Sequence, residues 1–136
     1  MRFPYHGAGI GLVKDGCILL GKRSDRPFLG RWCVPGGGRE KADASELETA
    51  VREFCEETGV DFSTLDAKPI GNWKLHLPFF SWCTFFYLVS DFEASFSLDE
   101  FSDIQWVPIS EVSIKKHLRP FTRSEVRCLS KLLEGN

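Results

Sequence analysis

The order of the expected elements predicts an α/β (α+β) fold, in which a mixed β-sheet carries helices packed on its faces. Segments rich in apolar and β-branched residues occupy the first quarter of the chain and return after a central amphipathic helix, and a second amphipathic helix closes the sequence. The length of 136 residues, of which 43% are hydrophobic, is enough for one core, so we expect a single domain over residues 1–136.

The first quarter is expected to form three short strands separated by glycine-rich turns. The expected strands are Ala8–Val13, Cys17–Leu20 and Arg31–Val34. Asp15-Gly16, between the first two strands, is a strong signal for a tight hairpin turn. A loop at 24–30 leads to the third strand, which is expected to stop at Pro35 and to be followed by a glycine loop at 36–38.

The central helix is expected to run from Ser45 to Thr58. Ser45 with Glu48, or Asp43 with Glu46, has the spacing of a capping box at the N-terminus of the helix. The glycine that follows Thr58 is expected to end the helix. The apolar residues that recur at helical spacing, and that we therefore expect to face the core, are Leu47, Ala50, Val51 and Phe54.

The second half of the chain is expected to consist mainly of strands that precede the last helix. The expected strands are Ile70–Leu77, Ser81–Val89 and Ile104–Val107. Ser110 with Glu111 would begin a short helical turn. Apolar residues at helical spacing predict an amphipathic helix over Thr122–Leu133.

Charge, hydropathy and cysteine content argue against several classes of protein. The net charge of −2 gives no basic field for non-specific binding to nucleic acid. No apolar run approaches the roughly 20 residues that span a bilayer, and residues 1–16 lack a signal-peptide pattern, so we expect a cytoplasmic protein without nucleic-acid or membrane partners. The five cysteines include no C-x-x-C pair, which favours reduced thiols over a zinc site or a disulfide framework.

Three carboxylates share one side of the central helix. Glu53, Glu56 and Glu57 are spaced i, i+3 and i+4, and like charges this close repel one another. Residues 39–57 hold seven acidic and three basic side chains, and a bound cation would offset this excess. Hard divalent cations such as Mg²⁺ bind carboxylate oxygens and substrate phosphates together. Ordinary surface ion pairs of Arg52 with neighbouring glutamates would explain part of the same pattern.

A fixed spacing links the glycine run to this acidic helix. Fourteen positions after Gly38 the chain reads Arg52-Glu-Phe-Cys-Glu-Glu-Thr-Gly-Val60. This segment resembles the signature of the Nudix hydrolases, which reads Gly, five residues, Glu, seven residues, then Arg-Glu-(apolar)-x-Glu-Glu-x-Gly-(apolar). The segment Trp32-x-x-Pro35-Gly-Gly, just before it, resembles the approach to the signature that many members share. The resemblance covers 23 residues directly and implies the Nudix-type α/β/α sandwich with a mixed β-sheet between helices.

One position departs from the signature. The glutamate expected six residues after Gly38 is Ala44 in this chain. In the family that glutamate often pairs with the arginine of the signature, and we expect Glu48 to supply this contact to Arg52 instead. Glu40 or Glu46 would reach the metal through water. The departure leaves the number of metal ions and the rate open.

The resemblance implies hydrolysis of a nucleoside diphosphate linked to another group X, in which water attacks one phosphorus of the pyrophosphate. The implied cofactor is Mg²⁺, with Mn²⁺ as a substitute. Glu53 and Glu57 would be the main metal ligands, and Glu56 a third ligand or a base. The carbonyl of Gly37 would complete the metal shell, and Arg52 would orient the carboxylates through hydrogen bonds.

The general base and the phosphate ligands are less closely defined by the resemblance. Glu100, in a loop before the strand that holds Trp106, is the candidate base, with Asp99 and Asp103 nearby, and solvation of that loop is the alternative interpretation of all three. Three arginines are candidates to hold the substrate phosphates, although each alone is also typical of a surface charge; they are Arg23, Arg31 and Arg39.

An aromatic stretch leaves the substrate open. Its members are Trp73, His76, Phe79, Phe80 and Trp82, and filling the core of the sheet is the favoured interpretation, with stacking on a nucleotide base as the alternative. The expected partner is a small-molecule nucleoside diphosphate derivative, and the pattern does not separate nucleoside triphosphates, nucleotide sugars, ADP-ribose and dinucleoside polyphosphates. A homodimer is left open.

Two other functions compete with the hydrolase. A nucleotide-binding sensor with the Nudix fold and little turnover would be consistent with Ala44, although the retained carboxylates argue against it. An isomerase acting on a diphosphate lipid precursor, as in some relatives, would require Cys33 or Cys83 as the acid.

Overall fold

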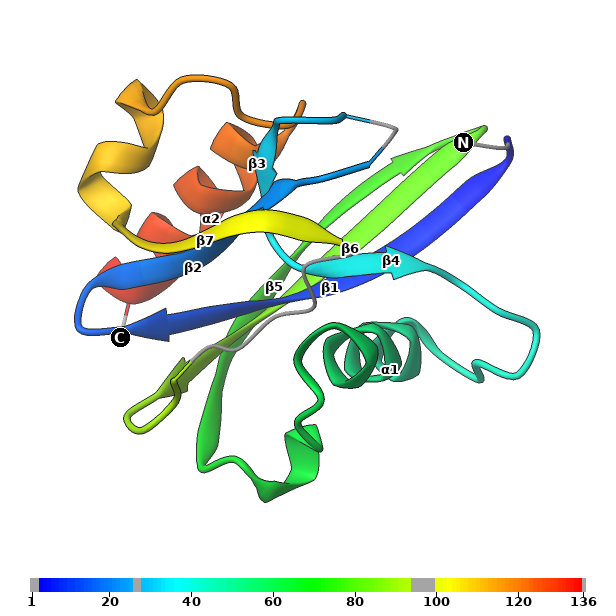
Figure 1. Ribbon diagram of the computed structural model, residues 1–136, viewed down its shortest axis with the longest axis horizontal. Helices are drawn as coiled ribbons and strands as arrows, with labels where there is room; N and C mark the ends of the chain where they lie inside the picture. Colours follow the sequence, from blue (N-terminus) through cyan, green and yellow to red (C-terminus); the bar gives the residue numbers. More distant parts are fainter. Residues whose placement is uncertain (1–2, 26–27, 94–99, 136) are drawn as a thin grey trace.

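The computed structural model describes residues 3–25, 28–93 and 100–135, and a mixed sheet lies at its centre (Figure 1). The strands are β1 (Tyr5–Lys14), β2 (Cys17–Arg23), β3 (Trp32–Cys33), β4 (Gly36–Gly38), β5 (Ala67–Leu77), β6 (Phe80–Val89) and β7 (Phe101–Pro108). The helices are α1 (Glu46–Thr58) and α2 (Thr122–Glu134), with 3₁₀ helices at Phe62–Thr64 and Ile109–Ile114.

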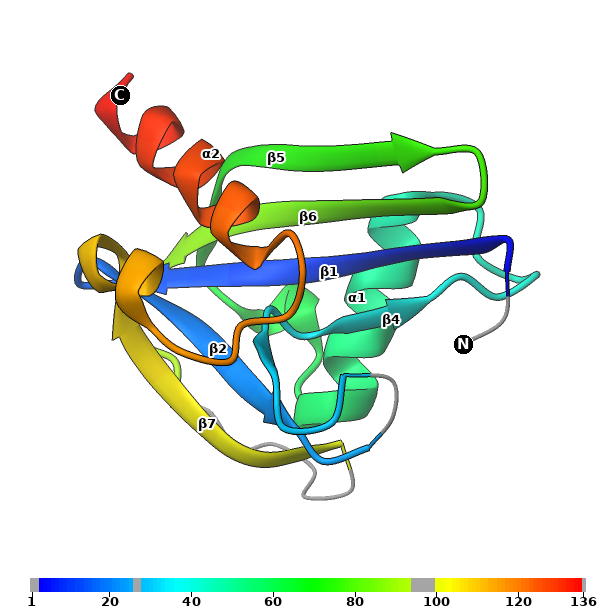
Figure 2. The same ribbon diagram turned by 90° about the horizontal axis from the view of Figure 1, so that it is seen from above.

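Strand β1 lies in the middle of the sheet. The strand order is β3-β2-β1-β6-β5, with β4 also paired to β1 and β7 to β2. Because β1 runs parallel to β6 and antiparallel to β2 and β4, the sheet is mixed, as the sequence predicts. Helices α1 and α2 lie on opposite sides of this sheet (Figures 1 and 2), which confirms the α/β/α sandwich.

Each face of the sheet has its own apolar core, because side chains alternate between the two faces along a strand. On the side of α1, Ile10 and Leu12 of β1 pack in one cluster with Phe54. On the side of α2, Phe86 of β6 packs in a second cluster with Leu129. The central strands therefore lie between two apolar cores, one under each helix.

The glycines of β1 make room for large rings on the α2 side of the sheet. The parallel register sets Gly7 opposite Trp82 and Gly11 opposite Phe86. A Cβ atom on Gly7 would lie 2.8 Å from the ring of Trp82, and one on Gly11 would lie 2.6 Å from the ring of Phe86. A larger residue at either place would therefore displace a ring, and this close approach positions Trp82.

The turn and cap signals of the sequence are confirmed. Asp15 and Gly16 have φ values of 52° and 75°, as a tight hairpin between right-twisted strands requires. The hydroxyl of Ser45 accepts a hydrogen bond from the amide of Glu48 at 3.2 Å, which caps α1. Gly59 ends the helix with φ 73°, in the left-handed region.

The glycine run is a strand rather than the expected loop. Gly36–Gly38 form β4, which pairs with β1 in antiparallel register. A Cβ atom on Gly37 would lie 2.3 Å from the carboxyl carbon of Glu53, so the backbone of β4 is pressed between β1 and α1. Three glycines permit this packing because none of them carries a Cβ atom.

Other boundaries differ because pairing partners extend the ladders. β1 begins at Tyr5 rather than Ala8, since Tyr5 pairs with Phe80 of β6. The expected helical turn after Ser110 is the 3₁₀ helix Ile109–Ile114. Leu47, expected in the core, is 39% exposed. The buried face of α1 consists instead of Thr49, Ala50, Phe54 and Glu57.

No helix in the described part of the chain is long and apolar enough to span a membrane. The five cysteines of the sequence are all free thiols, and Cys33 and Cys83 are buried. Burial raises the pKa of each of these two thiols above its ordinary value, because a buried site disfavours the charged thiolate.

Candidate active site

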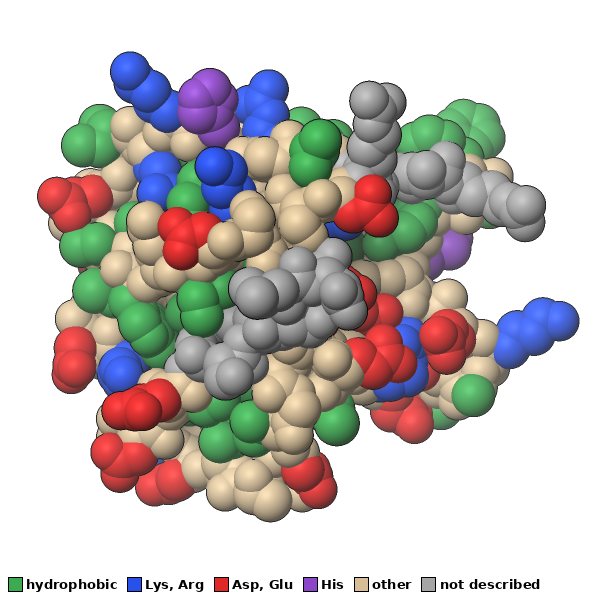
Figure 3. Space-filling view, in the orientation of Figure 1, with side chains coloured by type: hydrophobic (Ala, Val, Ile, Leu, Met, Phe, Trp, Pro, Cys, Tyr) green, Lys and Arg blue, Asp and Glu red, His purple; other side chains and the backbone are tan. Residues whose placement is uncertain are grey.

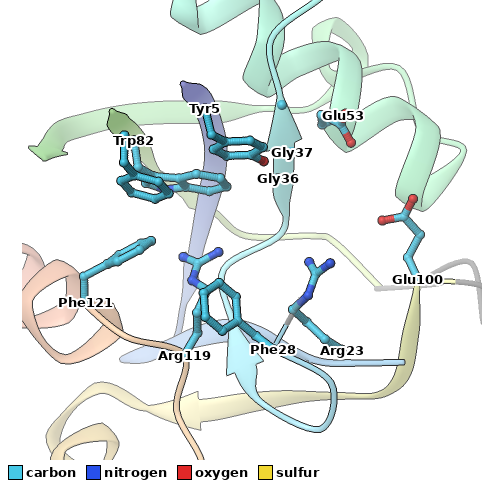
Figure 4. A pocket seen from close by; sticks show the side chains of 12 residues that line it. Tyr5, Arg23, Phe28, Gly36, Gly37, Glu53, Trp82, Glu100, Arg119 and Phe121 are labelled. Carbon is cyan, nitrogen blue, oxygen red and sulfur yellow. The ribbon is translucent and has the colours of Figure 1, made fainter. Parts of the chain in front are cut away.

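A cavity of about 240 Å³ opens beside β4, and its two ends differ in chemistry. Figure 4 shows Tyr5, Trp82 and Phe121 around one end, and Glu53 and Glu100 at the other. The backbone of β4 forms the wall that joins the two ends. One cavity therefore offers flat aromatic surfaces and carboxylates at the same time.

The carboxylate of Glu53 lies against the glycine strand at the acidic end. Its carboxyl carbon is the atom that a Cβ on Gly37 would meet at 2.3 Å. Burial raises the pKa of Glu53, and the neighbouring Arg52 opposes that rise. The helix thus presents an oxygen donor directly beside the backbone of β4.

Glu57 is buried without the partners that a buried carboxyl requires. Its side chain is 1% exposed, and neither carboxylate oxygen has a hydrogen-bond partner among the described residues. Burial, followed by the charges of Glu100 and Glu53, raises the pKa of Glu57 to about 9. Leaving such a group unpaired is costly. A divalent cation beside these carboxylates would satisfy it, so the residues present fit a metal ion.

Asp43 takes the place of the missing glutamate of the signature. Arg52 donates from Nε to Oδ1 of Asp43 at 3.1 Å and from Nη2 to Oδ2 at 3.0 Å, and this pair holds the pKa of Asp43 well below its usual range. The expectation that Glu48 would hold Arg52 is wrong, since the Glu48 carboxylate accepts from the amide of Ala44 at 3.0 Å. The signal in the sequence was Asp43 itself, an acidic residue directly before Ala44.

Arg52 ties the helix to the glycine strand and to two glutamates. Its Nη2 donates to the carbonyl oxygen of Gly38 at 2.8 Å, and its Nη1 donates to Glu53 and to Glu56 at 3.1 Å each. Figure 3 shows acidic side chains, with basic ones among them, gathered over α1. Arg52 is thus the cation that holds this acidic group together.

The carboxylates are not assembled as a finished metal site. In the parts of the chain that the structure describes, no three Asp, Glu, His or Cys side chains stand together so as to hold an ion. Glu56 is half exposed and bound to Arg52, and Glu46 pairs with Lys74 at 2.7 Å. Mg²⁺ usually keeps several waters and is bound through one or two protein carboxylates, so the absence of such a group of three does not conflict with a magnesium site.

The remaining predicted residues fall into two groups. Glu100 and Arg23 line the cavity (Figure 4), together with Glu53 and Gly37. The other two arginines line separate surface pockets. Arg31 lines a pocket beside the start of α2, and Arg39 lines two pockets that His6 also borders. Asp103 accepts from the amide of Ile104 on β7, and Asp99 lies outside the described residues.

The aromatic stretch was expected to fill the core with alternating members. Trp82, which is 3% exposed, confirms this, whereas Phe79 and His76 are exposed. Phe80 and Trp82 also line the cavity. Trp73 stacks on Phe121 with ring centroids 5.6 Å apart. His76 borders a different pocket. Phe121 and Tyr5, which complete the aromatic end, carried no sequence signal.

A buried ion pair at the aromatic end was also missed. Arg119 is 5% exposed, and its Nη2 donates to Oε1 of Glu125 at 2.9 Å. Glu125 is fully buried, and its Oε2 accepts from the hydroxyl of Thr84. Nε1 of Trp82 donates to the same hydroxyl at 2.7 Å. Burial raises the pKa of Glu125, while Arg119 and Thr84 oppose that rise by binding its charged form.

The cavity also bears on the isomerase alternative. Neither Cys33 nor Cys83 is among the described residues that line it.

Comparison with known proteins places this geometry in a family. The profile described as NUDIX domain matches residues 6–127. An ADP-ribose pyrophosphatase of Methanocaldococcus jannaschii is 47% identical over 49 residues, which cover 36% of this chain and 28% of that protein. An RNA pyrophosphohydrolase of Erythrobacter litoralis is 37% identical over 60 residues, covering 43% and 36%. The match therefore spans well under half the length of either relative.

A solved structure supports the fold over nearly the whole chain. A Caenorhabditis elegans Ap4A hydrolase in a binary complex superposes with a TM-score of 0.76, at 19% identity, over 97% of this chain and 99% of that one. The profile match covers most of the sequence, including the segment from the glycine strand to the end of α1. The chain belongs to the Nudix hydrolase family.

Proposed function

We propose that the protein is a Mg²⁺-dependent hydrolase that cleaves the pyrophosphate bond of a nucleoside diphosphate linked to another group X. The observation that carries this proposal is Glu57, a buried carboxyl beside Glu53 whose two oxygens have no partner in the described chain. The names of both curated relatives, an ADP-ribose pyrophosphatase and an RNA pyrophosphohydrolase, refer to pyrophosphate bonds and support the same chemistry.

Glu53 and Glu57, with the carbonyl of Gly37, would hold the metal ion, and Glu56 is the candidate third ligand. When bound, the ion would neutralise charge on the phosphates and lower the pKa of a bound water. Mn²⁺ would substitute for Mg²⁺ at the same oxygens. Arg52 keeps the Glu53 carboxylate in place through the 3.1 Å bond from Nη1.

The other lining residues have complementary parts in the reaction. Glu100 stands at the acidic end of the cavity and is the candidate to take a proton from the attacking water (Figure 4). Arg23 reaches into the same cavity and is the candidate to hold a phosphate oxygen. Arg31 and Arg39 would contact only the parts of a substrate that extend beyond it. Catalysis would then come mainly from holding the substrate in the reactive geometry.

The test is a panel of substrates with matched variants. Nucleoside triphosphates, nucleotide sugars, ADP-ribose and dinucleoside polyphosphates are incubated with Mg²⁺ or with chelator, and the products are separated by chromatography. Glu57→Gln is expected to lower the rate roughly 100-fold or more, because it removes a metal ligand. Glu111→Gln, an exposed residue outside the cavity lining, is the control.

Two results would contradict the proposal. Full activity in Glu57→Gln would remove the carboxylate from the mechanism. Nucleotide binding without any product after long incubation would support the sensor instead.

A further inference from the structure

The aromatic end of the cavity is built to receive a flat ring. Trp82 is 3% exposed and held in position by its hydrogen bond to Thr84. Tyr5 stacks on Phe80 with centroids 5.7 Å apart, so its ring is also fixed. Rings that are already ordered lose little entropy when a planar ligand stacks on them.

Arg119 stands among these rings as a cation whose charge is already compensated. Its guanidinium carbon lies 4.6 Å from the ring centroid of Trp82 and 4.4 Å from that of Phe121. Both oxygens of Glu125 accept hydrogen bonds, one of them from Arg119, so the guanidinium already has an acidic partner inside the fold. A phosphate would have to compete with this buried ion pair, whereas a neutral acceptor would not.

The guanidinium still has donors to offer. Its Nε has no hydrogen-bond partner among the described residues, although Arg119 is almost fully buried. An unsatisfied buried donor costs free energy, which a ligand acceptor would recover. Figure 4 shows the side chain extending into the cavity toward Trp82. A fixed donor array beside an aromatic slot is suited to the acceptor edge of a heterocycle.

Resting on the hydrolase function proposed above, we propose that Arg119 selects guanine as the base of the nucleotide substrate. Guanine carries two adjacent acceptors, O6 and N7, which match a guanidinium fork, whereas adenine carries a donor at N6 beside its N7 acceptor. Adenine would therefore face Arg119 donor to donor. Glu125 fixes the fork, and the half-buried rings of Tyr5 and Phe121, which line the cavity, supply the surfaces on which the base stacks.

Binding of the bare diphosphates tests this assignment without requiring turnover. Dissociation constants for GDP, ADP and 7-deaza-GDP are measured by calorimetry with chelator present, for the parent and for Arg119→Lys. The lysine keeps a positive charge beside Glu125 but loses the planar fork. Arg127→Lys, exposed on α2, is the matched control.

The parent is expected to bind GDP roughly 10- to 100-fold more tightly than ADP, and to bind 7-deaza-GDP about tenfold more weakly than GDP. Arg119→Lys is expected to bring GDP and ADP within about threefold of each other, and Arg127→Lys to leave the ratio unchanged. The ratio of the two constants does not depend on the fraction of folded protein, so a merely destabilised variant would not change it.

Two outcomes would overturn the assignment: equal affinity of the parent for GDP and ADP, or an unchanged ratio in Arg119→Lys. Its failure is distinguishable from failure of the hydrolase proposal. Hydrolysis of guanine and adenine substrates at equal rates would leave the hydrolase standing without this selectivity. Selective binding of GDP with no hydrolysis of any guanine nucleotide would leave the selectivity standing without the hydrolase.

Discussion

Two buried glutamates lie behind the two ends of the cavity, and they differ in what surrounds them. Glu57 lies near Glu53 of the acidic end, and Glu125 is bonded to Arg119 of the aromatic end. Burial raises the pKa of both Glu57 and Glu125. Glu125 receives hydrogen bonds on both oxygens, from Arg119 and Thr84, whereas Glu57 receives none from the described chain. A buried carboxylate that the fold itself satisfies is a structural anchor. One that the fold leaves unsatisfied indicates a ligand that the chain does not provide.

Matched amide substitutions should separate these two roles most strongly. Glu125→Gln is expected to lower the free energy of unfolding by about 3–5 kcal/mol, because it leaves the charge of Arg119 buried without a partner. Glu57→Gln is expected to change it by less than about 1 kcal/mol at pH 7, because the raised pKa keeps Glu57 protonated and an amide is as neutral. Urea denaturation of both variants in chelator measures this difference, and equal losses would contradict the comparison.

The partner of Arg52 gives the next largest effect. Asp43→Ala is expected to lower kcat/KM roughly 10- to 100-fold, because Arg52 would no longer be held where it orients Glu53. Asp66→Ala, an exposed residue outside the cavity, is the control. Steady-state kinetics with the substrate that the panel identifies provides the measurement. A rate within twofold of the parent would show that Glu53 does not depend on this ion pair.

The pH dependence of cation binding sharpens the view of Glu57. Since its folded-state pKa is raised from 4.5 to about 9, the folded protein holds the proton between those values, and a divalent cation must displace it. Affinity for Mg²⁺ is therefore expected to increase with pH between 6 and 9, by at most about tenfold per unit. Without a cation, the stability contributed by this group is greatest below pH 4.5 and is lost as the pH rises toward 9.

Calorimetric titration with Mg²⁺ at several pH values measures this dependence. Glu57→Gln is the control, and its affinity is expected to be low and nearly independent of pH over the same range. An equally steep dependence in that variant would assign the proton to another group.

The acidic end was largely predictable because its signals are local. The cap at Ser45, the left-handed Gly59 and the carboxylates of α1 each depend on residues within about one helical turn. The glycine strand was harder, since whether glycines turn or extend depends on what packs on them. Here Glu53 and β1 press on the backbone, and neither contact is encoded in the glycines themselves.

The aromatic end was not predictable from single residues, because its contacts join distant parts of the chain. Thr84 and Glu125 are 41 positions apart, and Trp82 reaches Glu125 only through Thr84. The alternation of Gly7, Gly9 and Gly11 was the available clue, since small residues on one face of a strand indicate large neighbours.

The smallest expected effect concerns the one core residue of α1 that was wrongly predicted. Leu47→Ala is expected to cost less than about 1 kcal/mol of unfolding free energy, because the side chain is 39% exposed and alanine favours the helix. Phe54→Ala, in the same helix, is expected to cost about 3–5 kcal/mol, because Phe54 is 1% exposed and packs on Phe62 and Phe92. Thermal and urea melts of the pair measure the difference. Similar losses would mean that α1 turns a different face toward the sheet, and the same rotation would move Glu57 out of its buried position.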